Sequence, residues 1–454
     1  MAAMKPVSIG KIIREVERLL DAKELDKVKP LIAGLHPSDI GIIIDHSESD
    51  DKLRILSLLD DETAAHVLLT VDSESLDYIV KALDSRRISE LTSEMEPAEA
   101  TDIIAELPAK KRAKVIESMP KEEADKVSEL LKFKETSAGG IMGTDFIGLA
   151  EDLTAEEALK KVRGISLDPN TPYYIYVVDK DQRLLGVLPF RKLVFAPPSE
   201  KLANIMNRDV ISVNLRDDQE EVAKLVSKYD LLSVPVVDEE RHLKGVITAD
   251  DVMDIIRDEA TEDIMRMSGA AVSEAIFTSP RRSAMKRLPW LYLHLGTASI
   301  TALIIGVYQQ TLSAFIALAV FMPLIASVGG SAGVQTLALI VRGIALGEVT
   351  FHDTRRLVLK EIAVGLLTGL LIGVFVAIFA YLWKGNPVFG LIIGASFIAS
   401  QIFACGIGVF TPLTLRKLGI DPALASSPFL SSLIDCVSYF SLLGFATLFL
   451  KYLK

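Results

Sequence analysis

The sequence predicts a multidomain protein in three parts: an all-α superhelical N-terminal domain, an α/β domain built from an internal repeat, and an all-α transmembrane domain of five helices. The first observation is charge, because the residues before Arg281 carry a formal charge of −19 and the remainder carries +8. The second is hydropathy, since all five membrane-length apolar segments follow Arg281. The third is a pattern that occurs twice between residues 137 and 260. A soluble half with this much negative charge attracts cations and repels nucleic acid, so we expect no nucleic-acid partner.

The C-terminal half is predicted to cross a membrane five times, because each segment can span a hydrocarbon core that takes about 20 apolar residues. The segments are Leu288–Tyr308, Leu312–Val341, Leu357–Trp383, Val388–Leu415 and Pro422–Leu450. Lys and Arg gather before the first segment, between the second and third, and between the fourth and fifth. Because positive loops stay inside, we expect a multi-pass protein of the cytoplasmic membrane with its N-terminus in the cytoplasm and its C-terminus outside.

Glycine and proline distinguish two of these spans. Pro323 and the small residues of Gly329–Gly333 predict irregular backbone in the second span. Lipid tolerates such backbone only at a pore or a tight helix interface, and a simple kink is the alternative. In the third span Gly365, Gly369 and Gly373 recur every four residues and predict a flat stripe for close helix packing.

Asp435 is an acidic residue deep inside the fifth apolar segment. It lies 14 residues beyond Asp421. At 1.5 Å per residue this is roughly 21 Å along a helix, too far for the carboxylate to reach the interface. An ionisable group at that depth usually serves function, so we expect Asp435 to attract or coordinate a cation. The alternative is a hydrogen bond to a neighbouring helix that only stabilises packing.

The soluble half contains the internal repeat. The two copies match at Ile141 and Ile205, Asp145 and Asp209, Glu156 and Glu220, Val177 and Val236, and Gly186 and Gly245. This pattern of strand, acidic helix and two further strands resembles a tandem pair of CBS domains. Thr248 and Asp251 belong to a G-x-x-T-x-x-D segment that resembles the one with which many CBS pairs hold an adenosine ribose. The first copy has Pro189 and Lys192 instead, so the pattern allows one adenine-nucleotide site, and a vestigial pocket is the alternative.

An acidic helix is predicted between the repeat and the first span. Its carboxylates recur at helical spacing: Asp251, Asp254 and Asp258, followed by Glu259, Glu262 and Asp263. Like charges three or four residues apart repel each other, and a divalent cation would replace that repulsion by bridging. Mg²⁺ and Ca²⁺ prefer such oxygen ligands. The alternative is a solvated helix face, the common fate of a charge run.

Residues 1–136 are predicted to form short helices. Pro97, Pro108 and Pro120 each suit the first turn of a helix and precede apolar residues at helical spacing. Successive short helices of this kind indicate a small superhelical stack. The N-terminal residues show no apolar signal region, so we expect this half to remain on the side of synthesis.

Several functional classes are disfavoured. The chain has no G-x-x-x-x-G-K-[ST] phosphate loop, which argues against a transport ATPase. No nucleophile–base pair is recognisable, so we expect no enzyme. Cys405 and Cys436 both fall in apolar segments and indicate small core residues rather than a disulfide framework.

The whole layout resembles the MgtE-type magnesium transporters, also described as channels. The most specific pieces are RLPW at 287–290, FMP at 321–323 with Gly329, Gly330 and Gln335, EATED at 259–263, and DPAL at 421–424 with Ser426, Pro428 and Asp435. The resemblance implies a helical superhelix domain over 1–136, CBS domains over 137–199 and 200–260, an acidic connecting (plug) helix over 261–287, and a five-helix pore domain over 288–454.

The resemblance also implies a mechanism. It suggests a homodimer with a pore between subunits, in which Asp435 binds hydrated Mg²⁺. Cytosolic Mg²⁺ would hold the pore shut by bridging acidic residues, for which the matching positions are Asp218, Glu220, Asp230, Asp251, Asp254, Glu259, Glu262 and Asp263. ATP would use Thr248 and Asp251. The chain departs from the usual family pattern at Ser331, Val334, Ser432 and Ile434. These departures leave open how the chain ranks Mg²⁺ against other divalent ions.

Two other functions fit the same sequence features. The first is a CBS-regulated carrier for another divalent cation or solute, with Asp435 as a proton relay. The second is a membrane protein that senses metal or nucleotide without transporting anything. Flux measurements in purified vesicles separate these functions from a magnesium channel.

Overall fold

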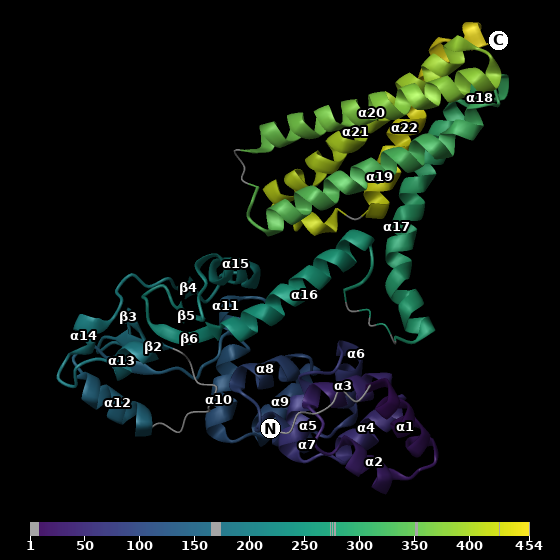
Figure 1. The fold of residues 1–454 in the computed structure, drawn as a ribbon. Coiled ribbons are helices and arrows are strands. Elements are labelled where there is room, and N and C mark those ends of the chain that lie inside the picture. Colours follow the sequence, from purple (N-terminus) through teal and green to yellow (C-terminus); the bar gives the residue numbers. More distant parts are fainter. Residues whose placement is uncertain are drawn as a thin grey trace. The chain divides into compact units, whose positions relative to one another are not determined.

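The computed structural model describes residues 9–164, 174–272, 274, 276, 278–349, 353–425 and 427–453 (Figure 1). The chain forms two compact units. The first runs to Asp258, and the second comprises Glu259–Glu274 and Thr278–Lys454.

The first unit begins with a series of short amphipathic helices, as predicted. They are α1 (Ile9–Asp21), α2 (Leu25–Ile32), α3 (Pro37–His46), α4 (Ser49–Ser57), α5 (Asp61–Leu68), α6 (Ser73–Ala82), α7 (Ser85–Thr92), α8 (Pro97–Ala105), α9 (Ala109–Ser118) and α10 (Lys121–Leu130). Pro97 occupies the first turn of α8, whereas Pro108 and Pro120 stand one residue earlier, at the N-caps of α9 and α10. Their apolar faces share one core, in which Ile44 and Ile79 are fully buried.

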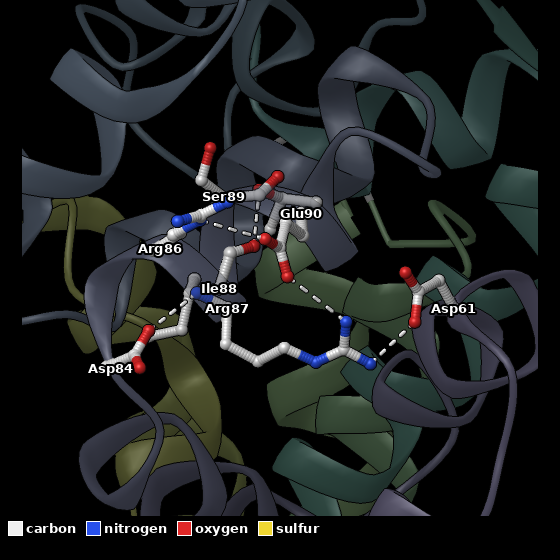
Figure 2. Close-up of polar contacts among 8 residues, drawn as sticks. Asp61, Asp84, Arg86, Arg87, Ile88, Ser89 and Glu90 are labelled. Atoms are coloured by element: carbon white, nitrogen blue, oxygen red, sulfur yellow. Dashed lines mark hydrogen bonds and ion pairs between the residues drawn. The ribbon is translucent and has the colours of Figure 1, made fainter.

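A polar contact also joins α7 to α5 of this stack (Figure 2). Arg87 on α7 reaches the Asp61 carboxylate at the start of α5, with an N–O distance of 2.7 Å, and also pairs with Glu90 at 3.3 Å. The Asp84 side chain caps α7 by accepting a hydrogen bond from the Arg87 backbone N–H at 2.7 Å. The cap gives a partner to one of the backbone N–H groups that would otherwise be free at the start of α7.

The internal repeat folds into two similar α/β modules, which confirms the predicted CBS pair. The first contains β1 (Gly148–Ala150), α12 (Ala155–Gly164), β2 (Tyr174–Val178), β3 (Leu184–Pro189) and α13 (Phe190–Val194). The second contains β4 (Val213–Asn214), α15 (Gln219–Tyr229), β5 (Ser233–Val237), β6 (Leu243–Thr248) and α16 (Ala249–Ser268), and α11 (Ala138–Ile141) and α14 (Leu202–Ile205) are short helices that precede each module.

Both modules have the same sheet topology. The strand orders are β1-β2-β3 and β4-β5-β6, each with one parallel and one antiparallel pairing. The sheets meet in an apolar core that includes Val178 and Val237. Within it the Tyr176 hydroxyl lies 2.7 Å from the Ser233 hydroxyl, so a buried polar contact joins the two copies.

The second unit contains five helices that are long and apolar enough to cross a membrane, which confirms the predicted number of spans among the described residues. These helices are α17 (Pro280–Val307), α19 (Leu318–Ala345), α20 (Thr354–Lys384), α21 (Pro387–Lys417) and α22 (Ser427–Leu448). Shorter elements are α18 (Gln309–Ala314), the 3₁₀ turn η2 (Pro422–Leu424) and α23 (Leu450–Leu453). Figure 1 shows α19, α20, α21 and α22 running side by side.

The predicted irregular backbone in the second span is wrong. The α19 helix is continuous through Pro323 and the glycines, and the chain breaks earlier, between α18 and α19. The glycines serve packing: a Cβ on Gly329 would lie 2.5 Å from Ser400 Oγ, and one on Gly333 would lie 2.2 Å from Ile434 Cδ1. The tight-interface alternative is therefore correct for this face of α19. An intact helix also keeps its backbone groups hydrogen-bonded within lipid.

The glycine stripe of the third span packs closely, as predicted. Gly365, Gly369 and Gly373 of α20 are buried against α21. A Cβ at Gly365 would lie 2.7 Å from the Gln401 carbonyl oxygen, and one at Gly369 would lie 2.9 Å from the Ile398 Cα. Only glycine permits this approach, so the stripe fixes the contact between α20 and α21.

Candidate functional site

An open groove of about 690 Å³ lies between α19 and α22. Its walls are formed by Pro323, Ala326, Ser327, Gly330, Ser331, Val334 and Gln335 of α19, and by Ser431, Asp435 and Tyr439 of α22. The α19 residues recur at three- and four-residue spacing, so they share one face of that helix. This face lies away from Gly329 and Gly333, which pack against neighbouring helices.

Asp435 is half-buried in the wall of this groove. Among the described residues its carboxylate has neither a hydrogen bond nor an ion pair. The neighbouring groove residues supply hydroxyl and amide groups, notably Ser331, Gln335 and Ser431. The groove thus combines one negative charge with oxygen atoms that can contact the water shell of a hard cation. The packing alternative requires a hydrogen bond to a neighbouring helix, and Asp435 forms none within residues 278–349, 353–425 and 427–453, although His294 of α17 lies close enough to interact with its charge.

The four positions that depart from the usual family pattern have different surroundings. Ser331 and Val334 line the groove. Ser432 instead faces α17, where its hydroxyl lies 3.0 Å from both Thr297 Oγ1 and His294 Nδ1. Ile434 packs against Gly333. Only the first two side chains can therefore touch an ion in the groove directly.

The end of the acidic connecting helix is attached to the membrane helices. Arg266 of α16 forms ion pairs with Glu262 of the same helix and with Asp421, which precedes α22. The other Asp421 oxygen accepts a hydrogen bond from the Ala423 backbone N–H at 2.8 Å. Next to Arg266, Met267 packs against the apolar cluster that contains Leu337 and Ile434. The contact thus links the acidic helix to the start of the helix that carries Asp435.

The candidate metal ligands of the second CBS module are not all brought together. Asp218 caps α15 and accepts a hydrogen bond from the Glu220 backbone N–H at 3.1 Å, and Glu220 pairs with Lys224 at 3.0 Å. Asp230 ends the same helix in a left-handed conformation. The helix separates it from Asp218 by roughly 18 Å. A single ion therefore cannot bind Asp218 and Asp230 of one chain at once.

The candidate residues on α16 lie along one exposed helix. Asp254 is 3.6 Å from Arg257, and Glu262 pairs with Arg266, so arginines already balance part of the charge. Glu259 and Asp263 are half-buried on the same helix. The i, i+3 and i+4 spacing predicted for these carboxylates is therefore realised.

Thr248 and Asp251 form the N-terminal cap of α16. One Asp251 oxygen accepts hydrogen bonds from the Thr248 backbone N–H at 2.8 Å and from its hydroxyl at 2.7 Å. Desolvation of the carboxyl group raises the pKa of Asp251 despite these bonds, although the residue as a whole is exposed. The pair is thus a structural cap whose other carboxylate oxygen can still accept a hydrogen bond.

Sequence analysis missed two acidic residues with unusual surroundings. Desolvation, together with the neighbouring Glu135 and Glu99 carboxylates, raises the pKa of Asp102 on α8 to about 7, although the residue as a whole is exposed. Glu361 of α20 is only 3% exposed within a membrane-length helix. A signal for Glu361 was its position four residues inside the predicted third span. No sequence signal pointed to the surroundings of Asp102, because Glu135 is far from it in sequence.

A third acidic group serves a turn instead. Asp238, Glu240 and His242 place possible metal-binding atoms within 4.8 Å of one another. However, Asp238 accepts hydrogen bonds from the backbone N–H groups of Glu240 and His242, and Lys244 Nζ lies 3.5 Å from it. In the first repeat Asp179 accepts the same bonds without a histidine. Asp238, Glu240 and His242 therefore stabilise the turn between β5 and β6.

Known families match the N-terminal domain, the internal repeat and much of the membrane domain. Residues 322–445 match the MgtE family described as "Divalent cation transporter", residues 35–136 match the MgtE intracellular N domain, and residues 138–199 and 202–258 match CBS domains. The magnesium transporter MgtE of Thermus thermophilus is 38% identical over 324 residues, which are 71% of this chain and 72% of the relative. The chain belongs to the MgtE family. The Enterococcus faecalis magnesium transporter MgtE is 37% identical over 71% of both chains.

Membership in the MgtE family places this chain among divalent cation transporters with a CBS pair and a multi-pass membrane domain, and these two relatives, which match it over 71% of its length, are named magnesium transporters, a class without enzymatic activity. Among solved structures, the cytosolic domain of the Mg²⁺ channel MgtE in complex with ATP is 32% identical. It aligns with 54% of this chain and 99% of its own, with a TM-score of 0.49.

Proposed function

We propose that this MgtE family member is a Mg²⁺ channel whose ion path follows the groove between α19 and α22. The observation that carries the proposal is Asp435, a carboxylate in a membrane-length helix that faces a groove of about 690 Å³ and forms no hydrogen bond or ion pair among the described residues. A charge left so exposed in lipid is costly unless water or an ion accompanies it. The groove supplies the space for both.

Mg²⁺ passes this site with much of its water shell in place. The ion dehydrates reluctantly and usually keeps several waters when it binds protein. Hydroxyl groups of Ser331 and Ser431 and the amide of Gln335 surround Asp435 and can hydrogen-bond those waters. We therefore expect Asp435 to attract the ion by charge, and the polar groove residues to orient its hydration shell.

The complete path requires two copies of the chain. The groove is open on one side, so one copy forms a half-channel rather than a closed pore. A twofold dimer, the commonest symmetric assembly, would place a second Asp435 opposite the first. In the membrane, the distribution of Lys and Arg supports a cytoplasmic N-terminus and an extracellular C-terminus.

Cytosolic Mg²⁺ closes this channel through the acidic connecting helix. Glu259, Glu262 and Asp263 lie on the part of α16 that precedes the first span. The Arg266–Asp421 contact joins that segment to the start of α22, so a shift of α16 is transmitted toward Asp435. Mg²⁺ on these carboxylates would hold the helix in its closed position, with Asp218, Glu220, Asp230, Asp251 and Asp254 as further ligands. ATP binding at Thr248 and Asp251 would adjust this response.

The test is divalent flux into liposomes that contain the purified protein, with internal Mg²⁺ varied. We expect rapid Mg²⁺ entry at low internal Mg²⁺ and strong suppression at high internal Mg²⁺. Neutralising Glu259, Glu262 and Asp263 together should leave the channel open at high internal Mg²⁺. Absence of Mg²⁺ flux under all conditions, or preference for another divalent ion, would favour a sensor or a different carrier.

A further inference from the structure

A second carboxylate is buried in the membrane helices outside the groove. Glu361 lies in the second turn of α20 and is 3% exposed. Burying a carboxylate beside lipid is costly, so such residues are generally retained for a function. Asp435 already accounts for the ion path, and Glu361 does not line the groove. Its role must come from the groups that it contacts.

Glu361 connects α20 to α19 through one of its two carboxylate oxygens. One oxygen accepts a hydrogen bond from the Thr336 hydroxyl of α19 at 3.1 Å. The other pairs with the Lys360 ammonium group at 2.6 Å. The buried Cys405 of α21 is a further polar group at this point and interacts with Thr336. Hydrogen bonds to a charged group in a low-dielectric interior are stronger than neutral ones.

Thr336 follows the groove residue Gln335 directly in α19. Successive residues of a helix point about 100° apart, so the two side chains lie on different faces. Gln335 lines the groove, whereas Thr336 is 4% exposed and packs toward α20 and α21. On the packed face a Cβ at Gly408 of α21 would lie 3.0 Å from the Thr336 Cβ. The Thr336–Glu361 bond therefore constrains which face of α19 meets the groove.

The bond differs in kind from the other contacts on this face. Glycines and apolar side chains such as Leu337 pack α19 against α21 and α22 without directional preference, whereas the hydrogen bond from Thr336 to Glu361 is directional. We propose that Glu361 is a positioning residue that fixes the rotation of α19 through Thr336 and thereby keeps Ser331 and Gln335 facing Asp435. This inference rests on the proposed ion path. It states that a contact outside the groove sets the rotation of the helix that forms one groove wall.

Cysteine labelling tests the rotation without any measurement of transport. The parent protein carries Cys436→Ser and retains Cys405, which is 2% exposed. Reporters are Ser331→Cys and Gln335→Cys in the groove and Leu337→Cys on the packed face, where Leu337 is fully buried. In the parent we expect a charged, water-soluble thiol reagent to label positions 331 and 335 but not 337.

The variants remove the bond with the smallest change of shape. Thr336→Val replaces the hydroxyl by a methyl group, Glu361→Gln removes the charge, and Thr336→Ser retains the hydroxyl. Glu348→Gln, at an exposed acidic residue of the same unit, is the matched control. We expect Thr336→Val and Glu361→Gln to slow labelling at position 335 at least threefold, and Thr336→Ser and Glu348→Gln to leave it unchanged. Unaltered labelling in both Thr336→Val and Glu361→Gln would overturn the proposal.

Flux measurements provide the functional readout. We expect Thr336→Val and Glu361→Gln each to change the ratio of Mg²⁺ to Co²⁺ flux at least threefold, with no further change when they are combined. A purely structural role would lower both fluxes in proportion and leave the ratio unchanged, which would also refute the proposal. If Glu361→Gln does not assemble, Thr336→Val alone decides. Normal transport by Asp435→Asn would refute the proposed ion path. The labelling experiment would still test the rotation of α19, because it does not measure transport.

Discussion

Asp435 and Glu361 are both acidic residues of membrane-length helices, yet they meet different surroundings. The Asp435 carboxylate faces a groove and forms no hydrogen bond or ion pair among the described residues, whereas Glu361 is bonded to Thr336 and Lys360. The first arrangement leaves a negative charge available to a passing cation. The second arrangement gives the Glu361 carboxylate partners within the protein, so that it holds neighbouring helices together. Depth in the membrane alone does not distinguish these two roles. The groups that each carboxylate contacts distinguish them.

Asp102 gives a prediction about pH at the scale of one residue. Its pKa is raised from 3.8 to about 7, first by desolvation and then by Glu135 and Glu99. Between these values the folded protein holds a proton that the unfolded chain has lost, so the stability of the first unit falls as pH rises through this window. We expect Asp102→Asn to raise the unfolding temperature at pH 8 and to change it little at pH 4.

Thermal unfolding in Mg²⁺-free buffer at pH 4, 6 and 8 checks this prediction. Asp145→Asn is a suitable comparison, because Asp145 is an exposed carboxylate of the same unit. A difference between Asp102→Asn and the parent that is equal at all three pH values would contradict the assigned titration.

Thr248 gives a second prediction at this scale. Its backbone N–H and hydroxyl both bond Asp251, and loss of a helix cap typically costs about 1 kcal/mol. We expect Thr248→Val to destabilise the second CBS module by about this amount and to weaken ATP binding, while Thr248→Ser retains both properties. Calorimetric ATP titration and chemical unfolding measure the two effects. Unchanged ATP affinity in a destabilised Thr248→Val protein would show that the pair is a cap alone.

At the scale of elements, α16 is coupled to the membrane helices by the Arg266–Asp421 pair. Arg266 supplies a positive charge to two carboxylates, so its loss leaves Glu262 and Asp421 without that counter-charge. We expect Arg266→Gln and Asp421→Asn each to weaken closure and to raise the internal Mg²⁺ needed for half-maximal suppression by about threefold or more. Because both variants break one contact, their effects should not add.

The charge exchange is the decisive control for this pair. In Arg266→Asp with Asp421→Arg the attraction is restored with its partners reversed, and we expect the Mg²⁺ response to return toward that of the parent. Flux into liposomes over a series of internal Mg²⁺ concentrations measures the response. Additive effects of the single variants, with no recovery in the exchange, would show that the contact does not couple the two elements.

The elements themselves were largely predictable from sequence, whereas their contacts were not. Hydropathy predicted five spans, and the internal repeat predicted the two α/β modules, because both patterns are local. The continuity of α19 was not predictable, since Gly329 and Gly333 stay helical only because Ser400 and Ile434 from distant segments pack against them. Arg266 was missed for the same reason, as its partner Asp421 is 155 residues away.

The site was predictable only in part. Asp435 was found because its depth in an apolar segment is readable from spacing. Glu361 lies four residues inside its predicted span, but it follows Lys360 near the charged end, where an acidic residue normally reaches water, so this signal was weaker than the depth of Asp435. Asp218 and Asp230 were both named as candidate Mg²⁺ ligands through the family resemblance, and α15 holds them at opposite ends.

At the scale of the whole molecule, charge is divided between an acidic soluble half and a membrane half with positive flanks. This division suits a protein that attracts cytosolic cations to one unit and passes them through the other. The acidic surface and the groove would then respond to the same ion, so transport limits itself as the ion accumulates. Such feedback needs no energy source beyond the ion gradient.

The central claim is that Mg²⁺ crosses the membrane beside the Asp435 carboxylate. The most direct test is the initial rate of Mg²⁺ entry into liposomes that hold equal amounts of parent, Asp435→Asn or Asp435→Glu protein, at low internal Mg²⁺. We predict that Asp435→Asn lowers the rate at least tenfold with assembly intact, and that Asp435→Glu retains part of it because the charge remains. A rate for Asp435→Asn equal to that of the parent would contradict the account.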